Sequence, residues 1–174
     1  MELKGLTKLN KAISAQLKPF GISRAELSDD YSYTFSDESV TFKVTENGLA
    51  DRLFEDFVEE RFNFRCDCPF VLSLLHEVGH HKANDEIDGA IYDFCFSEKE
   101  RIETELAVCD ENDIAKIKIL EYQYFNLPDE IMATQWAVNY AKTHPKKMQA
   151  LWKKAKQALF EFYDANGLFD EDEN

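Results

Sequence analysis

The chain lacks a surplus of positive charge. Its 174 residues include 20 Lys and Arg against 34 Asp and Glu, which gives a formal net charge of −14. Proteins that bind nucleic acid or anionic membranes rely on Lys and Arg, so direct binding to either is disfavoured. The acidity instead fits a role in solubility or in contact with a basic partner, and mimicry of nucleic acid is the less favoured interpretation.

Long apolar runs are also absent. No stretch reaches the length that spans a membrane, and the N-terminal MELKGLTKLNKAISAQLK is amphipathic, unlike a secretory signal. The four cysteines, at 66, 68, 95 and 109, match no common zinc-binding spacing. We therefore expect a cytoplasmic protein whose thiols are free.

Internal repeats and low-complexity linkers are missing as well, which favours a single domain over residues 1–174. Hydrophobic residues make up 44% of the chain and include 14 Phe and 7 Tyr, enough to form a substantial core. We expect the core over about 31–140, a C-terminal helix at 146–163 and a solvated acidic tail at 170–174.

What is present is mostly helical periodicity, with the clearest strand pattern at residues 31–44. Apolar and polar residues alternate on both sides of Ser36–Ser39, which predicts a β-hairpin and hence a helix-dominant α+β fold with a small antiparallel sheet. The predicted elements are a helix at 3–18, the hairpin at 31–44, helices at 49–62 and 69–83, a short strand at 90–96, a helix opened by a Ser97–Glu100 capping box, and helices from 128 and over 146–163. Asn84 is expected to end the helix at 69–83. Residues 101–125 show no clear pattern.

The most informative motif is HEVGH, residues 76–80, inside the helix predicted at 69–83. His76 and His80 are four residues apart, so both imidazoles lie on one helix face and can bind one ion. Glu77 lies about 100° around the helix, where its carboxylate can reach water beside the metal. Two imidazoles and one carboxylate leave zinc an open position, and Glu77 would then be the general base.

The alternative interpretation is a half-buried helix with coincidental histidines. The uncharged residues around the motif favour a buried active-site helix instead. Gly79 weakens a helix by about 1 kcal/mol relative to Ala and is explained if another element approaches closely. His81 lies about 100° from His80 and is expected to be a surface or supporting residue.

A third metal ligand is needed, and Glu130 is the stronger candidate. It lies in the first turn of the helix that follows Pro128, and Ala133 and Ala137 share its face, which permits close packing on HEVGH. Glu130 could alternatively only complement the helix dipole. Glu86, six residues after His80, and Asp129 are the other candidates.

HEVGH followed by a helix with the pattern E-x-x-A-x-x-aromatic-A resembles the small gluzincin metallopeptidases of the ImmA/IrrE type. The matching residues are His76, Glu77, Gly79, His80, Glu130, Ala133, Trp136 and Ala137. The resemblance implies a small sheet packed on an active-site helix and a glutamate helix. It also implies zinc bound by His76, His80 and Glu130, with Glu77 as the base; some relatives of this type cleave a transcriptional repressor. The chain departs from the pattern at Met132 and Thr134 and in the long insertion 97–125.

The favoured function is a zinc-dependent endopeptidase acting on a protein or peptide, with the strand at 40–44 aligning an extended substrate. The alternative is a metallopeptidase-fold binding protein of phage or mobile-element type, without turnover, whose acidic surface contacts a basic or nucleic-acid-binding partner. A structural protein without metal is the third possibility. The role of oxyanion stabiliser stays open among Tyr122, Tyr124, Tyr140 and His144.

Overall fold

A computed structural model describes residues 3–44, 48–83 and 86–168 of the chain. The elements, in chain order, are α1 (Leu6–Leu17), the 3-10 turn η1 (Lys18–Phe20), β1 (Arg24–Leu27), β2 (Ser32–Thr34), β3 (Ser39–Phe42), α2 (Leu49–Phe62), α3 (Pro69–Ala83), α4 (Gly89–Ala107), α5 (Ile114–Phe125), α6 (Pro128–Thr143) and α7 (Pro145–Asn166). The helix-dominant α+β class predicted from sequence is therefore confirmed. The expected stop at Asn84 and the acidic tail at 170–174 lie outside the described residues.

The sheet has three strands in the order β1-β3-β2. The predicted hairpin is present, since β2 and β3 pair antiparallel, with Tyr33 opposite Val40. The expectation of a purely antiparallel sheet is wrong, because β1 adds a parallel partner to β3, with Ala25 opposite Val40. The sheet is therefore mixed.

The two edges of this sheet differ. The backbone N–H of Ala25 donates to Ser14 Oγ at 2.7 Å, and that of Leu27 donates to Asn10 Oδ1 at 3.0 Å, so α1 covers the edge of β1. The strand at 40–44, expected to align a substrate, is the central strand β3 and has a neighbour on both sides. That expectation is wrong, because only β2 carries an open edge among the described strands.

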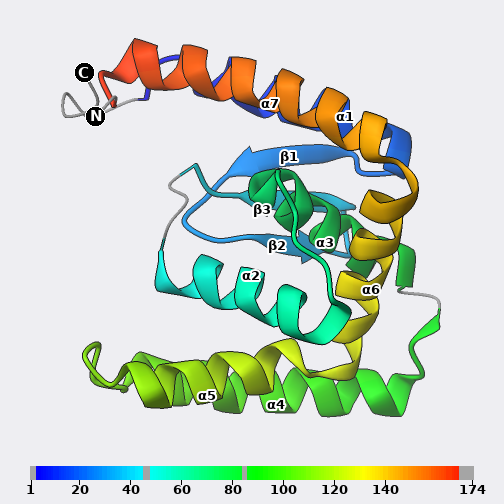
Figure 1. The fold of residues 1–174 in the computed structure, drawn as a ribbon, viewed down its shortest axis with the longest axis vertical. Coiled ribbons are helices and arrows are strands. Elements are labelled where there is room, and N and C mark those ends of the chain that lie inside the picture. Colours follow the sequence, from blue (N-terminus) through cyan, green and yellow to red (C-terminus); the bar gives the residue numbers. More distant parts are fainter. Residues whose placement is uncertain (1–2, 45–47, 84–85, 169–174) are drawn as a thin grey trace.

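Helices cover the sheet in layers (Figure 1). α1 and α7 lie side by side on one side of the sheet, whereas α3 packs against β2 and β3. α3 contacts α6 more extensively than any other pair of described elements contact each other. Lys4 and Asn166 join the chain's two ends, with Lys4 N donating to Asn166 Oδ1 at 2.9 Å and Asn166 Nδ2 donating to Lys4 O at 2.9 Å.

α4 corrects two predictions. Residues 90–96, expected as a strand, and Ser97, expected as a helix start, all lie inside this one helix. The helix begins earlier because the Asp88 carboxylate accepts a hydrogen bond from Ala90 N at 2.9 Å, which is an N-cap. α4 then pairs with α5, and the two form a helical hairpin at the bottom of Figure 1. Among the described helices, none is both long and apolar enough to cross a membrane.

Candidate metal centre

α3 holds the two histidines in the interior. Most of this helix is buried, including His76 and His80. The pair lies one turn apart, and the two Nε2 atoms are 3.2 Å from each other. Two buried imidazoles with adjacent nitrogen atoms are costly unless something pairs with them.

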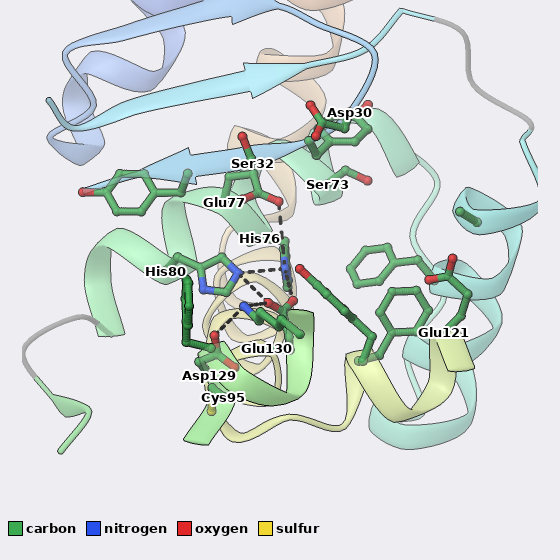
Figure 2. A pocket seen from close by; sticks show the side chains of 18 of the residues that line it. Asp30, Ser32, Ser73, His76, Glu77, His80, Cys95, Glu121, Asp129 and Glu130 are labelled. Carbon is green, nitrogen blue, oxygen red and sulfur yellow. Dashed lines mark hydrogen bonds and ion pairs between the residues drawn. The ribbon is translucent and has the colours of Figure 1, made fainter. Parts of the chain in front are cut away.

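α6 supplies the carboxylate. Pro128 occupies the first turn of this helix, where a missing N–H costs nothing, and Glu130 follows two residues later. Glu130 Oε2 lies 3.0 Å from His76 Nε2, and Oε1 lies 3.4 Å from His80 Nε2. Figure 2 shows the three side chains converging from the two helices.

Gly79 explains how the two helices come so close. A Cβ atom built on Gly79 would lie 2.3 Å from Ala133 O and 2.7 Å from Ala133 Cα. Any side chain at position 79 would therefore collide with the backbone of α6. Ala133 and Ala137 are fully buried at the same contact. The sequence-based explanation of Gly79 as a point of close approach is thus confirmed.

The spacing of the donor atoms fits a tetrahedral metal ion. His76, His80 and Glu130 each offer one ligand atom, and these atoms lie within 4.8 Å of one another. His76 Nε2 lies 3.0 Å from Glu130 Oε2 and 3.2 Å from His80 Nε2, close to the edge of a tetrahedron, about 3.3 Å for metal–ligand bonds of about 2.0–2.1 Å. Two imidazoles and one carboxylate also form the donor set of catalytic zinc sites.

Thr134 orients the first histidine. Its Oγ1 lies 3.0 Å from His76 Nδ1, and both residues are buried. When Nδ1 carries the proton, it donates to Thr134 and leaves the Nε2 lone pair directed at the metal position. The resemblance flagged position 134 as a departure, yet a threonine hydroxyl can perform this orienting role.

Glu77 lies next to the metal position without being part of the ligand group. Its Oε1 is 3.9 Å from His76 Nε2, and its side chain is buried. Burial raises the pKa of Glu77 to about 7, although His76 opposes the shift. A carboxylate with a pKa near neutrality matches the requirement for a general base.

Glu130 differs from Glu77 although both are buried. Burial by itself would raise the pKa of Glu130, but His80 and His76 hold it well below its ordinary value. The lowered pKa favours the ionised form of Glu130, whereas the raised pKa lets Glu77 exchange a proton near neutral pH. Two carboxyl groups in opposite environments are the usual division between ligand and acid–base roles.

Lys99 is a site residue that the sequence did not indicate. Its Nζ lies 2.5 Å from Glu130 Oε1 and 2.5 Å from Asp129 Oδ2. Burial alone would lower the pKa of Lys99, but the charge of Glu130 and the hydrogen bonds to Asp129 and Glu130 outweigh burial and raise it. The lysine therefore remains an ammonium ion, and it neutralises the carboxylates of α6 from the side of α4.

The candidate centre lies in a cavity of about 420 Å³. β2 and the residues beside it form one wall, α4 forms another, and α2 and α5 contribute to the remaining side. Tyr124 lines the cavity, whereas Tyr122, Tyr140 and His144 do not. Tyr124 is thus the one oxyanion candidate among these four that reaches the cavity.

The other proposed ligands are not part of the group. Glu86 is exposed, and Asp129 contacts Lys99 rather than the histidines. Neither belongs to the triad of ligand atoms found among the described residues. His81 points elsewhere too, because its Nδ1 forms a 2.7 Å hydrogen bond with the hydroxyl of Tyr33. The four cysteines are free thiols.

No protein-family model, curated protein or solved structure significantly matches this chain. The chemistry of the centre is therefore inferred from its own geometry and residues.

Proposed function

We propose that the protein is a zinc-dependent endopeptidase that hydrolyses a peptide bond in a protein substrate. The observation that carries the proposal is the convergence of His76, His80 and Glu130, whose ligand atoms lie within 4.8 Å of one another beside a buried Glu77. This arrangement supports both metal binding and a general base within one cavity. The two short motifs that resemble ImmA/IrrE-type gluzincins contribute all four residues.

His76, His80 and Glu130 would hold a zinc ion, which when bound would supply a Lewis acid for the peptide carbonyl and lower the pKa of water. Glu77 takes a proton from water and passes it to the nitrogen of the leaving amine. Thr134 holds the His76 ring in position during these steps. Tyr124 is the proposed donor to the developing oxyanion, since its hydroxyl stays protonated: burial and Glu130 raise its pKa.

The open edge of β2 is the proposed site of substrate alignment. Residues 32–34 form no backbone hydrogen bond outside the β3 ladder within the described part of the chain. An extended peptide can pair with these groups by strand addition. Ser32 and Tyr33 line the cavity, so a peptide on this edge passes over the metal centre.

Elemental analysis of purified protein tests the metal. We expect one zinc per chain in the wild type and in Glu86→Ala, and loss of zinc in His76→Ala and Glu130→Ala. Glu77→Gln should retain zinc. Zinc-free wild-type protein, after growth in zinc-supplemented medium and mild purification, would contradict the proposal.

Proteolysis is tested on a library of peptides from a bacterial cytoplasmic extract, with new termini identified by mass spectrometry. Wild-type protein should generate termini that Glu77→Gln does not, because only the base has been removed. Cleavage that is equal for both proteins would show that Glu77 is not the base and would overturn the mechanism.

One observation favours a second function, a binding protein without turnover. Lys99 already gives Glu130 a counter-charge without any metal. If wild type and His76→Ala are equally stable and zinc-free, and a basic partner is retained by Glu77→Gln, the binding function is the better description. Neutralising acidic surface residues should then abolish capture of that partner.

A further inference from the structure

α4 exposes aromatic side chains that core packing does not explain. Tyr92 is 44% and Phe96 is 55% exposed. They lie one turn apart on the same helix face, and Cys95 and Lys99 continue that face. All four residues line the cavity of the metal centre. Exposed apolar side chains grouped beside a cavity commonly mark a binding surface.

Phe35 extends this surface from the opposite wall. It directly follows β2, is 40% exposed and also lines the cavity. Its ring centroid is 6.2 Å from that of Tyr92, with the two rings nearly perpendicular. We call Phe35, Tyr92 and Phe96 the aromatic wall. It offers one large apolar side chain a contact with three rings.

The opposite end of the cavity has unpaired negative charge. Asp30, just before β2, and Glu121, on α5, both line it. Neither forms an ion pair within the described part of the chain. Figure 2 shows Asp30 and Glu121 on the side of the centre away from His80. We call these two residues the acidic end.

The lysines of the cavity offset only part of its negative charge, although the charge of Lys43 also acts on Glu121. Of the described residues that line the cavity, six are Asp or Glu and two are Lys. Lys43 Nζ lies 2.7 Å from Asp51 Oδ1, and Lys99 is bound to Asp129 and Glu130. A divalent ion at the triad would still leave an excess of negative charge. The electrostatic complement of this cavity is therefore a cationic ligand.

β2 sets the distance between the two features. Asp30 and Phe35 lie on either side of this strand, in a bend and a turn, and are five residues apart, which is at most about 17 Å at about 3.4 Å per residue. A peptide extended along the open edge has the same rise. Only side chains an even number of residues apart point the same way, so those that face the acidic end and the aromatic wall are about four positions apart.

We propose that the cavity selects an extended peptide with a Lys or Arg about four residues from a large apolar residue. The basic side chain lies at the acidic end and the apolar one against the aromatic wall, on either side of the metal centre. This specificity rests on the proposed peptidase function and names its substrate class.

The test measures peptide binding to zinc-loaded Glu77→Gln protein, so that hydrolysis does not interfere. The probe is a fluorescein-labelled decapeptide with Lys and Phe four residues apart in a Ser/Gly/Ala background, and its binding is followed by fluorescence anisotropy. We expect replacement of the peptide's Phe by Ala, or of its Lys by Glu, to weaken binding at least tenfold.

Two matched pairs of variants test whether the aromatic wall selects the peptide's Phe and whether the acidic end selects its Lys. Phe96→Ala should remove the preference for Phe over Ala in the peptide, whereas Phe94→Ala should not. Phe94 is 54% exposed on the same helix but does not line the cavity. Glu121→Gln should reduce the preference for Lys over Ala about fivefold or more, and the exposed Glu100→Gln on α4 should leave it unchanged.

Each outcome separates this inference from the peptidase function. Selective binding that depends on Phe96 and Glu121, without cleavage by wild-type protein, supports the specificity and contradicts the peptidase. Cleavage by wild-type protein without any Phe or Lys preference supports the peptidase and overturns the specificity. Equal effects of Phe96→Ala and Phe94→Ala, or no detectable binding of the probe, would also overturn it.

Discussion

The helix pair α3–α6 and the helical hairpin α4–α5 border the same cavity, but they are built in opposite ways. α3 and α6 meet through Gly79 and Ala133 with no space for another atom, and their functional side chains are buried. Outside the main core, α4 and α5 share a small cluster, in which Cys95, Ile102 and Leu120 pack with Leu127, the residue just before α6. The difference is consistent with a division in which the buried pair holds the candidate ligands and the hairpin carries part of the proposed recognition surface.

The largest effect on stability is expected from a substitution at Gly79, which tests how tightly α3 packs on α6. Gly79→Ala should lower the free energy of unfolding by about 3 kcal/mol, because the new methyl group meets backbone atoms that cannot move alone. Gly89→Ala is the control, since a Cβ there has no neighbour within 4 Å. Urea denaturation measures both. Equal stability of the two variants would show that the α3–α6 contact is not tightly packed.

Lys99 is where the hairpin reaches into the buried pair. Lys99→Met should destabilise the metal-free protein by about 2 kcal/mol, less than the roughly 3–5 kcal/mol of a fully buried pair, because the lysine side chain is 22% exposed. Zinc should reduce this loss by neutralising Glu130. Thermal unfolding with and without zinc measures the difference.

The control for this variant is Lys147→Met, which removes an exposed lysine of α7. It should change neither melting temperature. If Lys99→Met behaves in the same way, Lys99 does not contribute to the neutralisation of Glu130, and the hairpin is independent of the centre.

Thr134 tests the buried pair without altering a ligand. Thr134→Val keeps the shape but removes the hydrogen-bond partner of His76 Nδ1, so zinc affinity should fall about 10- to 100-fold. A competition titration with a chromophoric chelator measures the affinity. Thr104→Val, at an exposed position of α4, should leave it unchanged. Unaltered affinity in both would mean that the ring is held by packing alone.

The smallest effect on stability is expected on the exposed face of α4. Phe94→Ala and Phe96→Ala should each change the free energy of unfolding by no more than about 0.5 kcal/mol, because both side chains are more than half exposed. Chemical denaturation is again the measurement. A decrease of about 2 kcal/mol or more in the free energy of unfolding of Phe96→Ala would identify Phe96 as a core residue. The hairpin would then not differ from α3–α6 in this respect.

The buried pair was also the part that sequence reasoning predicted best. The i, i+4 spacing of His76 and His80, and the small residues on the face of Glu130, carry information within one helix each. Gly79 is informative for the same reason, since its cost in a helix requires a packing explanation. Local patterns therefore indicated which two helices meet, whereas binding of a metal remains a prediction.

The other elements and site residues could not be predicted from local sequence patterns. β1 contains a single buried residue, Ala25, and is held by parallel pairing to β3 and by side chains of α1, so it has no alternation to detect. AIYDFCF is enriched in aromatic residues typical of strands, yet Asp88 caps it as a helix. Lys99 and Thr134 act only through contacts with residues far away in the sequence, and these appear only once the chain is folded.

The mutual hydrogen bonds between Lys4 and Asn166 have a practical consequence for handling the molecule. The described chain begins and ends at one corner of the fold, beyond the sheet from the α4–α5 hairpin (Figure 1). Affinity tags or surface tethers attached at either end would thus leave the cavity accessible. The same proximity makes the chain suited to circular permutation, with new ends opened in the 108–113 connection of the hairpin.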